Sequence, residues 1–317
     1  MNRFRLVKST LMPLTAGSLL WALLLCVSYG QSPPKPWKPI TGKVPTGVSV
    51  YSLTLEQPLR AWMVVTDLKK SGLDFRPLVS TEKDGKESVS SLASKAGAVV
   101  AVNASYFKLK GNPCEIVGWF VLDGKRLSRA SSFQMHRDVK FTVARSALIW
   151  TRAGLLRTAW VREHEGKVVE LSRPIPNKDL EPARGERARG TGRSVGEVKH
   201  AVAAGPMLIK NGDMRVTNDE EMLFAGRDDR HPRTVVGLRG SKLYLMVIDG
   251  RQKGVSRGST LLQAARLMSE WGVSNAMNLD GGGSSTLVVG GRLINLPLGR
   301  KYQRSVPTAL ALIPRKK

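Results

Sequence analysis

The sequence is poor in cysteine, with only Cys26 and Cys114 among its 317 residues. Two cysteines allow at most one disulfide, and none inside the domain if Cys26 is removed with the N-terminal segment described below. A scaffold held by several disulfides is therefore excluded, and folding must depend on a hydrophobic core. No obvious base accompanies Cys114, so we interpret it as a packed side chain rather than a nucleophile.

Acidic residues are also scarce, with 25 Asp and Glu against 50 Lys and Arg, for a formal net charge of +25. A charge of this size attracts polyanions, whether nucleic acid, anionic lipid or phosphate-bearing glycan. No recognisable nucleic-acid module accompanies it, so we expect no nucleic-acid partner. Association with an anionic membrane surface stays open. Sites for two metal ions typically contain a dense cluster of histidine and aspartate. The sequence contains 4 histidines and no such cluster.

No hydrophobic run is long enough for a clear transmembrane helix. Residues 1–30 instead have the pattern of a signal peptide: basic residues, then a compact apolar stretch at 19–27, then small residues at Ser28 and Gly30. We therefore predict a protein exported to the periplasm or the extracellular space. If the segment were not cleaved, it would anchor the protein to the membrane.

The rest of the chain is expected to form one domain. A hydrophobic content of 42% is ordinary for a globular protein and allows a sizeable core. Residues 31–47 are rich in proline and predict a linker, which leaves 48–317 as the domain. Within it, residues from about 177 to 199 mix arginine with glycine and predict a flexible basic insert. Oligomeric state is not predicted.

Strand patterns dominate the domain. Only 88–96 and 259–271 have convincing helical spacing. Alternating or continuous apolar runs predict strands near residues 48–53, 60–65, 73–78, 99–102, 119–122, 141–150, 154–160, 234–238, 242–248, 276–279 and 286–289. Strands with a few helices that do not alternate regularly predict an α+β fold with mixed β-sheets.

A glycine-rich loop follows the strand predicted at 276–279. It contains Asn278, Asp280, three consecutive glycines (281–283) and Ser284. Glycines let the backbone turn sharply and direct several N–H groups to one point, which suits a phosphate or a developing oxyanion. Asp280 could serve there as acid, base, nucleophile or hydrogen-bond acceptor. A plain turn between strands is the alternative interpretation.

Three further polar segments lie against predicted strands. His231 and Arg233 precede one strand, and an arginine fork beside a histidine suits phosphate binding and proton transfer. Asp249 and Arg251 follow another strand, where a turn is the simpler explanation. Asn103 follows the run at 99–102 and could hydrogen-bond a sugar. The adjacent aromatic residues could stack on a sugar or lie in the core.

Taken together, these segments resemble the phosphodiester glycosidase family in order and spacing. The resemblance covers roughly residues 95–313 and is carried by Asn103–Phe107, Gly205–Pro206, Asn211–Gly212, His231–Thr234, Asp249–Arg251, Asn278–Ser284 and Arg304–Leu310. It implies a single phosphodiester-glycosidase-type domain that hydrolyses a sugar C1–O–P linkage to a free sugar and a phosphomonoester. The substrate would be a phosphate-containing glycan, most naturally an anionic envelope or extracellular one.

The resemblance also implies roles for these residues. Asp280 would be nucleophile or general base, His231 a proton donor or phosphate ligand, and Asp249 a second carboxylate or a brace for an arginine. The residues expected to bind substrate or phosphate are Arg233, Arg251, Asn103, Asn278, Gly281, Gly282, Gly283 and Ser284. No cofactor is expected, and a need for a divalent metal stays open.

Two features depart from the family pattern. Asn103-Ala104-Ser105 replaces a turn that resembles Asn-Gly-Gly in bacterial members, and the insert at 177–199 has no counterpart. Either would favour a larger anionic polymer as substrate. Two other functions remain open. One is a non-catalytic basic protein that binds anionic envelope polysaccharide, and the other is a metal-dependent phosphodiesterase with Asp249, Asn278 and Asp280 as oxygen ligands.

Overall fold

The computed structural model describes residues 33–223, 228–299 and 302–315. The predicted signal peptide lies outside these ranges. None of the helices within them is long and apolar enough to cross a membrane.

The described residues form mostly β-structure. The largest sheet has eight strands, and each neighbouring pair is antiparallel. From edge to edge its strands are β1 (Lys38–Pro39), β2 (Ser49–Leu55), β3 (Leu59–Asp67), β20 (Lys242–Ile248), β19 (Arg233–Arg239), β21 (Asn275–Asn278), β17 (Met207–Lys210) and β18 (Asp213–Met214).

Two smaller sheets and two hairpin ribbons are antiparallel as well. The seven-stranded sheet contains β15 (Arg193–Ser194), β14 (Lys167–Leu171), β13 (Leu156–His164), β12 (Arg145–Thr151), β16 (Val198–Ala203), β8 (Phe120–Leu122) and β9 (Lys125–Ser128). The five-stranded sheet contains β23 (Arg292–Leu293), β22 (Leu287–Val289), β5 (Val100–Asn103), β24 (Thr308–Pro314) and β4 (Leu73–Val79). The ribbons are β10 (Phe133–His136) with β11 (Val139–Thr142), and β6 (Tyr106–Phe107) with β7 (Ile116–Val117). The helices of the described residues are α1 (Val89–Lys95), α2 (Glu186–Arg189), α3 (Leu261–Glu270) and the 3-10 turns η1 (Gly282–Ser284) and η2 (Pro297–Gly299).

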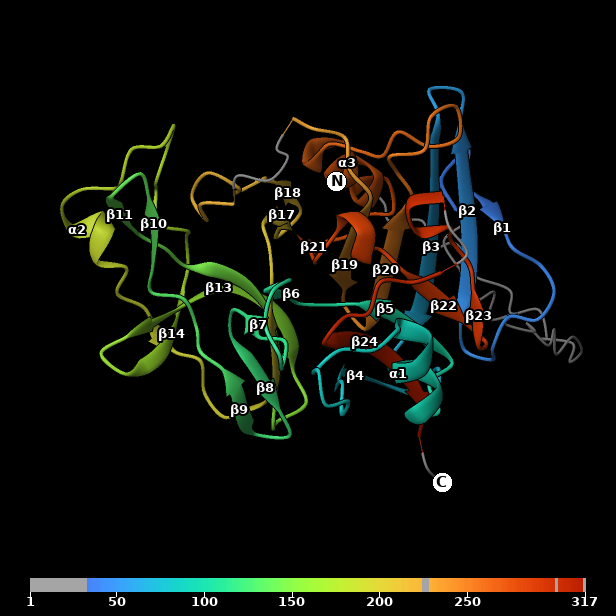
Figure 1. The fold of residues 1–317 in the computed structure, drawn as a ribbon, viewed down its shortest axis with the longest axis horizontal. Helices are drawn as coiled ribbons and strands as arrows, with labels where there is room; N and C mark the ends of the chain where they lie inside the picture. The colour runs from blue at the N-terminus through green and yellow to red at the C-terminus, as the bar shows by residue number, and fades with distance from the viewer. Residues whose placement is uncertain (1–32, 224–227, 300–301, 316–317) are drawn as a thin grey trace, which may run out of the picture. The chain divides into compact units, whose positions relative to one another are not determined.

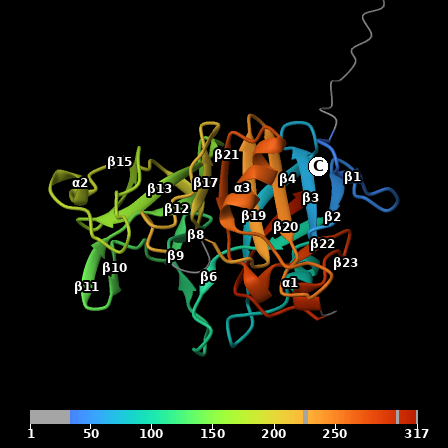
Figure 2. The same cartoon turned by 90° about the horizontal axis from the view of Figure 1, so that it is seen from above.

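Both helices predicted from the sequence are confirmed. Ser88 caps α1, and its hydroxyl accepts a hydrogen bond from the Ser91 amide. Thr260 caps α3 in a capping box with Gln263, which satisfies amide groups that a helix start leaves unpaired. The apolar side of α3 packs on β17, β19 and β21, and Figure 2 shows this helix lying over the large sheet.

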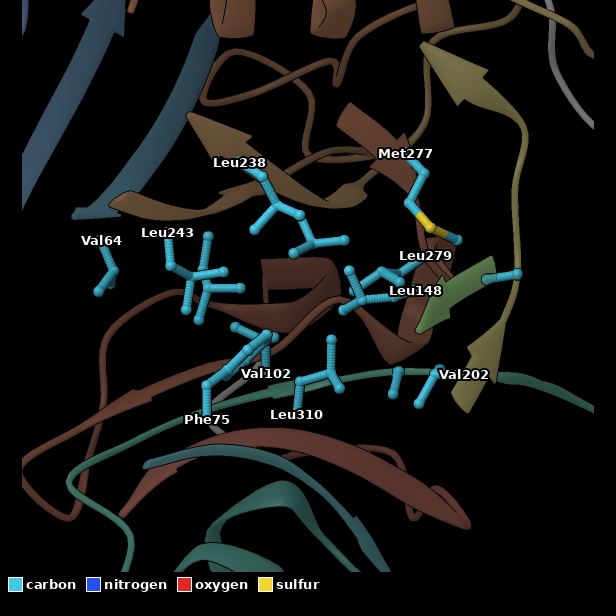
Figure 3. Packing of buried hydrophobic residues seen from close by; sticks show 14 of the residues in the cluster. Val64, Phe75, Val102, Leu148, Val202, Leu238, Leu243, Met277, Leu279 and Leu310 are labelled. Atoms are coloured by element: carbon cyan, nitrogen blue, oxygen red, sulfur yellow. The ribbon is translucent and has the colours of Figure 1, made fainter. Parts of the chain in front are cut away.

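The main core lies where the three sheets meet. Figure 3 shows Val64 of the eight-stranded sheet, Val102 and Leu310 of the five-stranded sheet, and Leu148 and Val202 of the seven-stranded sheet, in one cluster. None of these five side chains is more than 1% exposed. Burying one such side chain contributes about 1.5–3 kcal/mol, so this cluster is the main force holding the sheets together.

On the far side of the five-stranded sheet, α1 covers a separate apolar cluster. The order α3, eight-stranded sheet, five-stranded sheet, α1 can be followed in Figure 1, with the seven-stranded sheet beside these layers. The candidate loops lie where β5, β20 and β21 end and where β19 begins.

Three expectations need correction or refinement. The expected mixed sheets are wrong, because every strand pairing in the described residues is antiparallel, and the fold is mostly β rather than balanced α+β. The predicted linker contributes β1 and the buried Trp37, whose ring lies 5.6 Å from that of Trp271. The basic insert contains α2 and β15, and its Arg193 pairs with Glu170. Apolar and ionic contacts that composition does not reveal hold both segments on the domain.

Candidate active site

The glycine-rich loop begins where β21 ends, and its backbone is tied to the neighbouring loop. The Gly281 N–H donates to Asp280 Oδ1 at 2.9 Å, and the Gly282 N–H donates to the Pro232 carbonyl at 2.9 Å. These two amides are therefore satisfied within the protein, so Gly281 and Gly282 do not direct free N–H groups to one point as the sequence suggested. What the glycines allow is close packing, since a Cβ on Gly281 would lie 2.9 Å from the Pro232 oxygen.

Asp280 is partly exposed at the start of this loop. Burial raises the pKa of its carboxyl group to about 6, against the lowering effects of the Ser284 hydroxyl, the Gly281 N–H and the Arg304 charge. A carboxyl group that titrates near neutral pH is suited to proton transfer. Ser284 itself is fully buried, which places it beneath the carboxylate rather than in the open site.

Asn103 holds three segments together. Its Oδ1 accepts hydrogen bonds from the Thr234 hydroxyl at 2.7 Å and the Thr286 amide at 3.1 Å, and its Nδ2 donates to the Asp280 carbonyl at 2.6 Å. The side chain is 0% exposed. The expectation that Asn103 contacts a sugar is therefore corrected, because its amide group is already used to position the Asp280 loop.

His231 pairs with Arg251 across the rim of the site. The Nη2 of Arg251 lies 3.1 Å from Nδ1 of His231, and since arginine only donates, Nδ1 accepts and the ring proton lies on Nε2. Burial, followed by the charges of Arg233 and Arg251, lowers the pKa of His231. A histidine kept neutral in this way can donate a hydrogen bond from Nε2. It is a weak general acid at neutral pH.

Arg233 is buried just beyond this pair, at 5% exposure. Its Nε donates to the Ser259 carbonyl at 3.1 Å and its Nη2 to the Asp229 carbonyl at 3.0 Å. Burial lowers its pKa to about 10, which still leaves it charged at neutral pH. Arg251, by contrast, is exposed. A Cβ on Gly282 would lie 3.6 Å from its guanidinium nitrogens, so Arg251 reaches over the glycine-rich loop.

Asp249 is a brace rather than an open carboxylate. It is 1% exposed, and its two oxygens accept from Asn295 Nδ2 at 2.9 Å and from the Leu296 amide at 3.3 Å. Asn295 Nδ2 also donates to the Ser285 carbonyl at 2.9 Å, at the end of the glycine-rich segment. Burial raises the pKa of Asp249. The catalytic role expected for it has no support in this geometry, and the residue that it braces is an asparagine rather than an arginine.

A cavity of about 420 Å³ lies beside these loops, and we call it the Tyr106 cavity. Its polar lining consists of Tyr106, Ser131, Gln134, Arg145, Arg233 and Asn278, and its apolar lining includes Val117, Ala203 and Met222. The Tyr106 hydroxyl donates to the Gly205 carbonyl at 2.8 Å, and burial together with the negative charge of Asp280 raises its pKa.

Two polar atoms of this lining are buried without a protein hydrogen-bond partner: Arg145 Nη1 and Asn278 Oδ1. Buried polar atoms are rarely left unpaired, so a donor and an acceptor are available here for a ligand. Asn278 thus lies at the wall of a cavity, and its role in binding substrate stays a prediction.

Sequence reasoning missed Arg145 and Arg304 as site residues. A Cβ on Gly283 would lie 2.5 Å from Arg304 Nη2, so this exposed arginine covers the glycine-rich loop. Arg304 also lines a second cavity of about 240 Å³ with Gly283 and Tyr302. Its position in one of the segments that carried the family resemblance was a usable signal. Arg145 had none, because only the position of β12 in the fold brings it to the cavity lined by Tyr106.

The described ranges contain no group of three or more His, Cys, Asp or Glu side chains that could hold a metal ion. Of the three oxygen ligands suggested for a metal-dependent phosphodiesterase, Asp249 is bound to Asn295 and to the Leu296 amide, whereas Asn278 Oδ1 has no protein partner.

Comparison with known proteins identifies a family and several relatives that this chain resembles. A sequence model of the phosphodiester glycosidase family matches residues 96–313. The N-acetylglucosamine-1-phosphodiester alpha-N-acetylglucosaminidase of Bos taurus is 27% identical over 252 residues, which are 76% of this chain and 39% of the bovine protein. The chain thus spans about two fifths of the length of that relative.

Solved structures share the fold. The catalytic domain of the zebrafish N-acetylglucosamine-1-phosphodiester alpha-N-acetylglucosaminidase superposes with a TM-score of 0.61 at 20% identity, covering 87% of this chain and 85% of that one. A Burkholderia pseudomallei protein named as exported gives a TM-score of 0.58 at 19% identity, covering 81% and 74%.

Proposed function

The chain belongs to the phosphodiester glycosidase family, and from this premise we propose that it hydrolyses a glycosyl phosphodiester to a free sugar and a phosphomonoester. The observation that supports this proposal most is the setting of Asp280. Its carboxyl group has a pKa raised to about 6 and stands in a loop whose two ends line cavities that contain arginine.

In the proposed reaction, Asp280 acts as a general base. The oxygen of a water molecule bonds to sugar C1 while the C1–O bond breaks, the electron pair of that bond stays on the phosphate oxygen, and the water proton moves to the Asp280 carboxylate. A carboxyl group with a pKa near the working pH is well matched to this transfer. A route in which Asp280 bonds to C1 first is the alternative, and the two differ in the stereochemistry at C1.

The phosphate is the leaving group, and it needs charge stabilisation more than a strong acid. Three arginines surround the glycine-rich loop: Arg233, Arg251 and Arg304. They would hold the oxygens of the phosphate by charge-assisted hydrogen bonds. His231, which is neutral, would donate from Nε2 to the same group. We therefore propose that His231 is a phosphate ligand rather than the proton donor.

The substrate that we propose is a phosphate-containing glycan outside the cytoplasm. The formal charge of +25 favours an anionic polymer, and the structurally similar Burkholderia protein is named as exported. The sugar itself is unassigned, because the enzyme from cattle named above shares 27% identity with this chain over a minority of its own length.

The test is hydrolysis of N-acetylglucosamine-1-phospho-methyl-mannoside and of p-nitrophenyl phosphodiesters in ¹⁸O-labelled water, with and without a chelator. Label in the released sugar indicates C1–O cleavage, and label in the phosphomonoester indicates P–O cleavage. We expect label in the sugar and no effect of the chelator.

The matched variants are Asp280→Asn and Asp138→Asn, which remove the same charge. Asp280→Asn should lower kcat/KM by about 10²–10⁴-fold, the range that a general base supplies, whereas the exposed Asp138 should be neutral. Label in the phosphate together with inhibition by the chelator would favour a metal-dependent phosphodiesterase. Binding of anionic glycan without turnover of any substrate would favour a non-catalytic binding protein.

A further inference from the structure

A second large hollow lies at the other end of β17 and β21 from the glycine-rich loop. It has a volume of about 670 Å³ and lies between β13, β14, the basic insert and the strand ends that carry Lys210 and Asn275. We call it the cationic cleft, and its charged lining is Arg157, Arg193, Lys210 and Glu170. Three cations therefore face one carboxylate.

That single carboxylate is already shared. Glu170 Oε2 lies 2.8 Å from Arg157 Nη1, and its Oε1 accepts from Arg193 Nε at 2.6 Å. The Lys210 ammonium donates to the Thr158 carbonyl at 2.6 Å and lies 5.8 Å from the centre of the Trp160 ring. Within the described ranges no carboxylate lies within 4.0 Å of the Lys210 nitrogen. The cleft thus keeps a surplus of positive charge.

A buried hydroxyl group points to the same conclusion independently. Thr158 lines the cleft and is 2% exposed, and its Oγ1 has no hydrogen-bond partner. Buried hydroxyls in native proteins are normally paired. Burial lowers the pKa of Lys210, and so do the charges of Arg157 and Arg193, whereas Glu170 opposes this shift; a bound anion would oppose it further.

We propose that the cationic cleft is a second anion site, which binds a phosphate group of the glycan away from the phosphodiester that is cleaved. Lys210, Arg193 and the Thr158 hydroxyl would contact the anion, and Glu170 would hold the two arginines in place. Asn275 and Asn278 are separated by roughly 10 Å along β21, so the cleft and the active site are distinct. The proposal rests on the proposed function for the identity of the polymer, and it gives the basic insert a role.

The first measurement is calorimetric binding of inorganic phosphate and of a glycerol phosphate polymer to the protein, compared with a polymer of galacturonic acid. The informative variant is Lys210→Met, which keeps the aliphatic stem on Trp160 and removes the charge. Lys125→Met on the exposed strand β9 is the control for net charge. Arg193→Gln is a second informative variant, because Arg193 is 82% exposed and the buried Glu170 keeps Arg157 as its partner.

We expect the phosphate polymer to bind about tenfold more weakly to Lys210→Met and to Arg193→Gln, and within twofold of normal to Lys125→Met. Equal weakening in all three variants would overturn the proposal, because it would mean that net charge alone binds the polymer. Preference for the galacturonate polymer would also overturn it, since phosphate would then not be the group recognised.

Hydrolysis of a small phosphodiester separates this proposal from the proposed function. Lys210→Met should leave kcat/KM for the small substrate unchanged and raise KM for the polymer. If the normal protein hydrolyses neither substrate, the proposed function fails, but the binding comparison still decides whether the cleft is an anion site. An equal loss on small and polymeric substrates would assign Lys210 a purely structural role.

Discussion

The two ends of β21 differ in how their charged and amide side chains are held. At the end that carries the glycine-rich loop, two buried side chains are paired inside the protein: Asn103 makes three hydrogen bonds, and both oxygens of Asp249 are occupied. At the other end, Lys210 and two arginines share one carboxylate, and Thr158 Oγ1 lacks a partner.

This difference separates residues that position the backbone from residues that are available to bind a ligand. Paired groups fix the backbone around Asp280, so that the site needs little reorganisation before reaction. Unpaired groups with surplus charge are what a ligand can use, and they occur in the cationic cleft and at Arg145 and Asn278 of the Tyr106 cavity. Several residues that look like ligands in the sequence are therefore supports in the fold.

The largest expected effect concerns Glu221, which lies between the two regions. Its fully buried carboxylate accepts hydrogen bonds from Ser146, Met207, Thr217 and Trp160, and the Trp160 ring in turn contacts Lys210. Glu221→Ala leaves these donors unpaired and should lower the free energy of unfolding by about 3–5 kcal/mol.

Urea denaturation measures this change. The exposed Glu115 provides the control, and Glu115→Ala should change stability by less than about 0.5 kcal/mol. If Glu221→Ala also lowers the free energy of unfolding by less than about 1 kcal/mol, the hydrogen bonds around Glu221 do not couple the two regions.

An intermediate effect is expected for Asn295, which links Asp249 to the glycine-rich segment. Asn295→Ala removes the bonds to Asp249 and Ser285 and the acceptor for the Leu287 amide, which should misplace the loop of Asp280. A shift of about 1 Å at a reacting group can cost up to about 10²-fold in rate. We expect kcat to fall by about that factor with KM little changed, as measured by steady-state kinetics. A rise in KM with normal kcat would mean that Asn295 serves binding instead.

The smallest effect is expected for Asp280→Asn, which should raise the stability of the protein rather than lower it. The pKa of Asp280 is raised in the folded state from 3.8 to about 6, so its favourable contribution is complete below pH 3.8 and is lost as the pH rises through 6. Asp280→Asn should therefore stabilise the protein by about 1–2 kcal/mol at pH 8 and have no effect near pH 3.5. Unfolding measured at both pH values tests this. Equal stability of the two proteins at pH 8 would show that the carboxyl group is not strained by burial.

The sequence predicted local structure well where one pattern acts alone. The helical spacing at 88–96 and 259–271 identified α1 and α3. Pairing of strands far apart in the sequence is different, because period-2 alternation does not encode which strand is the neighbour or in which direction it runs. The sheets were therefore expected to be mixed and are antiparallel.

For the site, residue types and their order were sufficient to identify the family, and the roles given to Asp280, His231, Arg233 and Asn278 stay predictions. These residues were proposed because short motifs contain the residue types that the chemistry requires. Which polar groups remain available could not be predicted, because burial and pairing depend on segments that meet only after folding. Asn103 and Asp249 became supports because Thr286 and Asn295 came to lie beside them. Arg145 and Lys210 could not be predicted as site residues for the same reason. They lie on β12 and β17 and line cavities that form only when the sheets pack together.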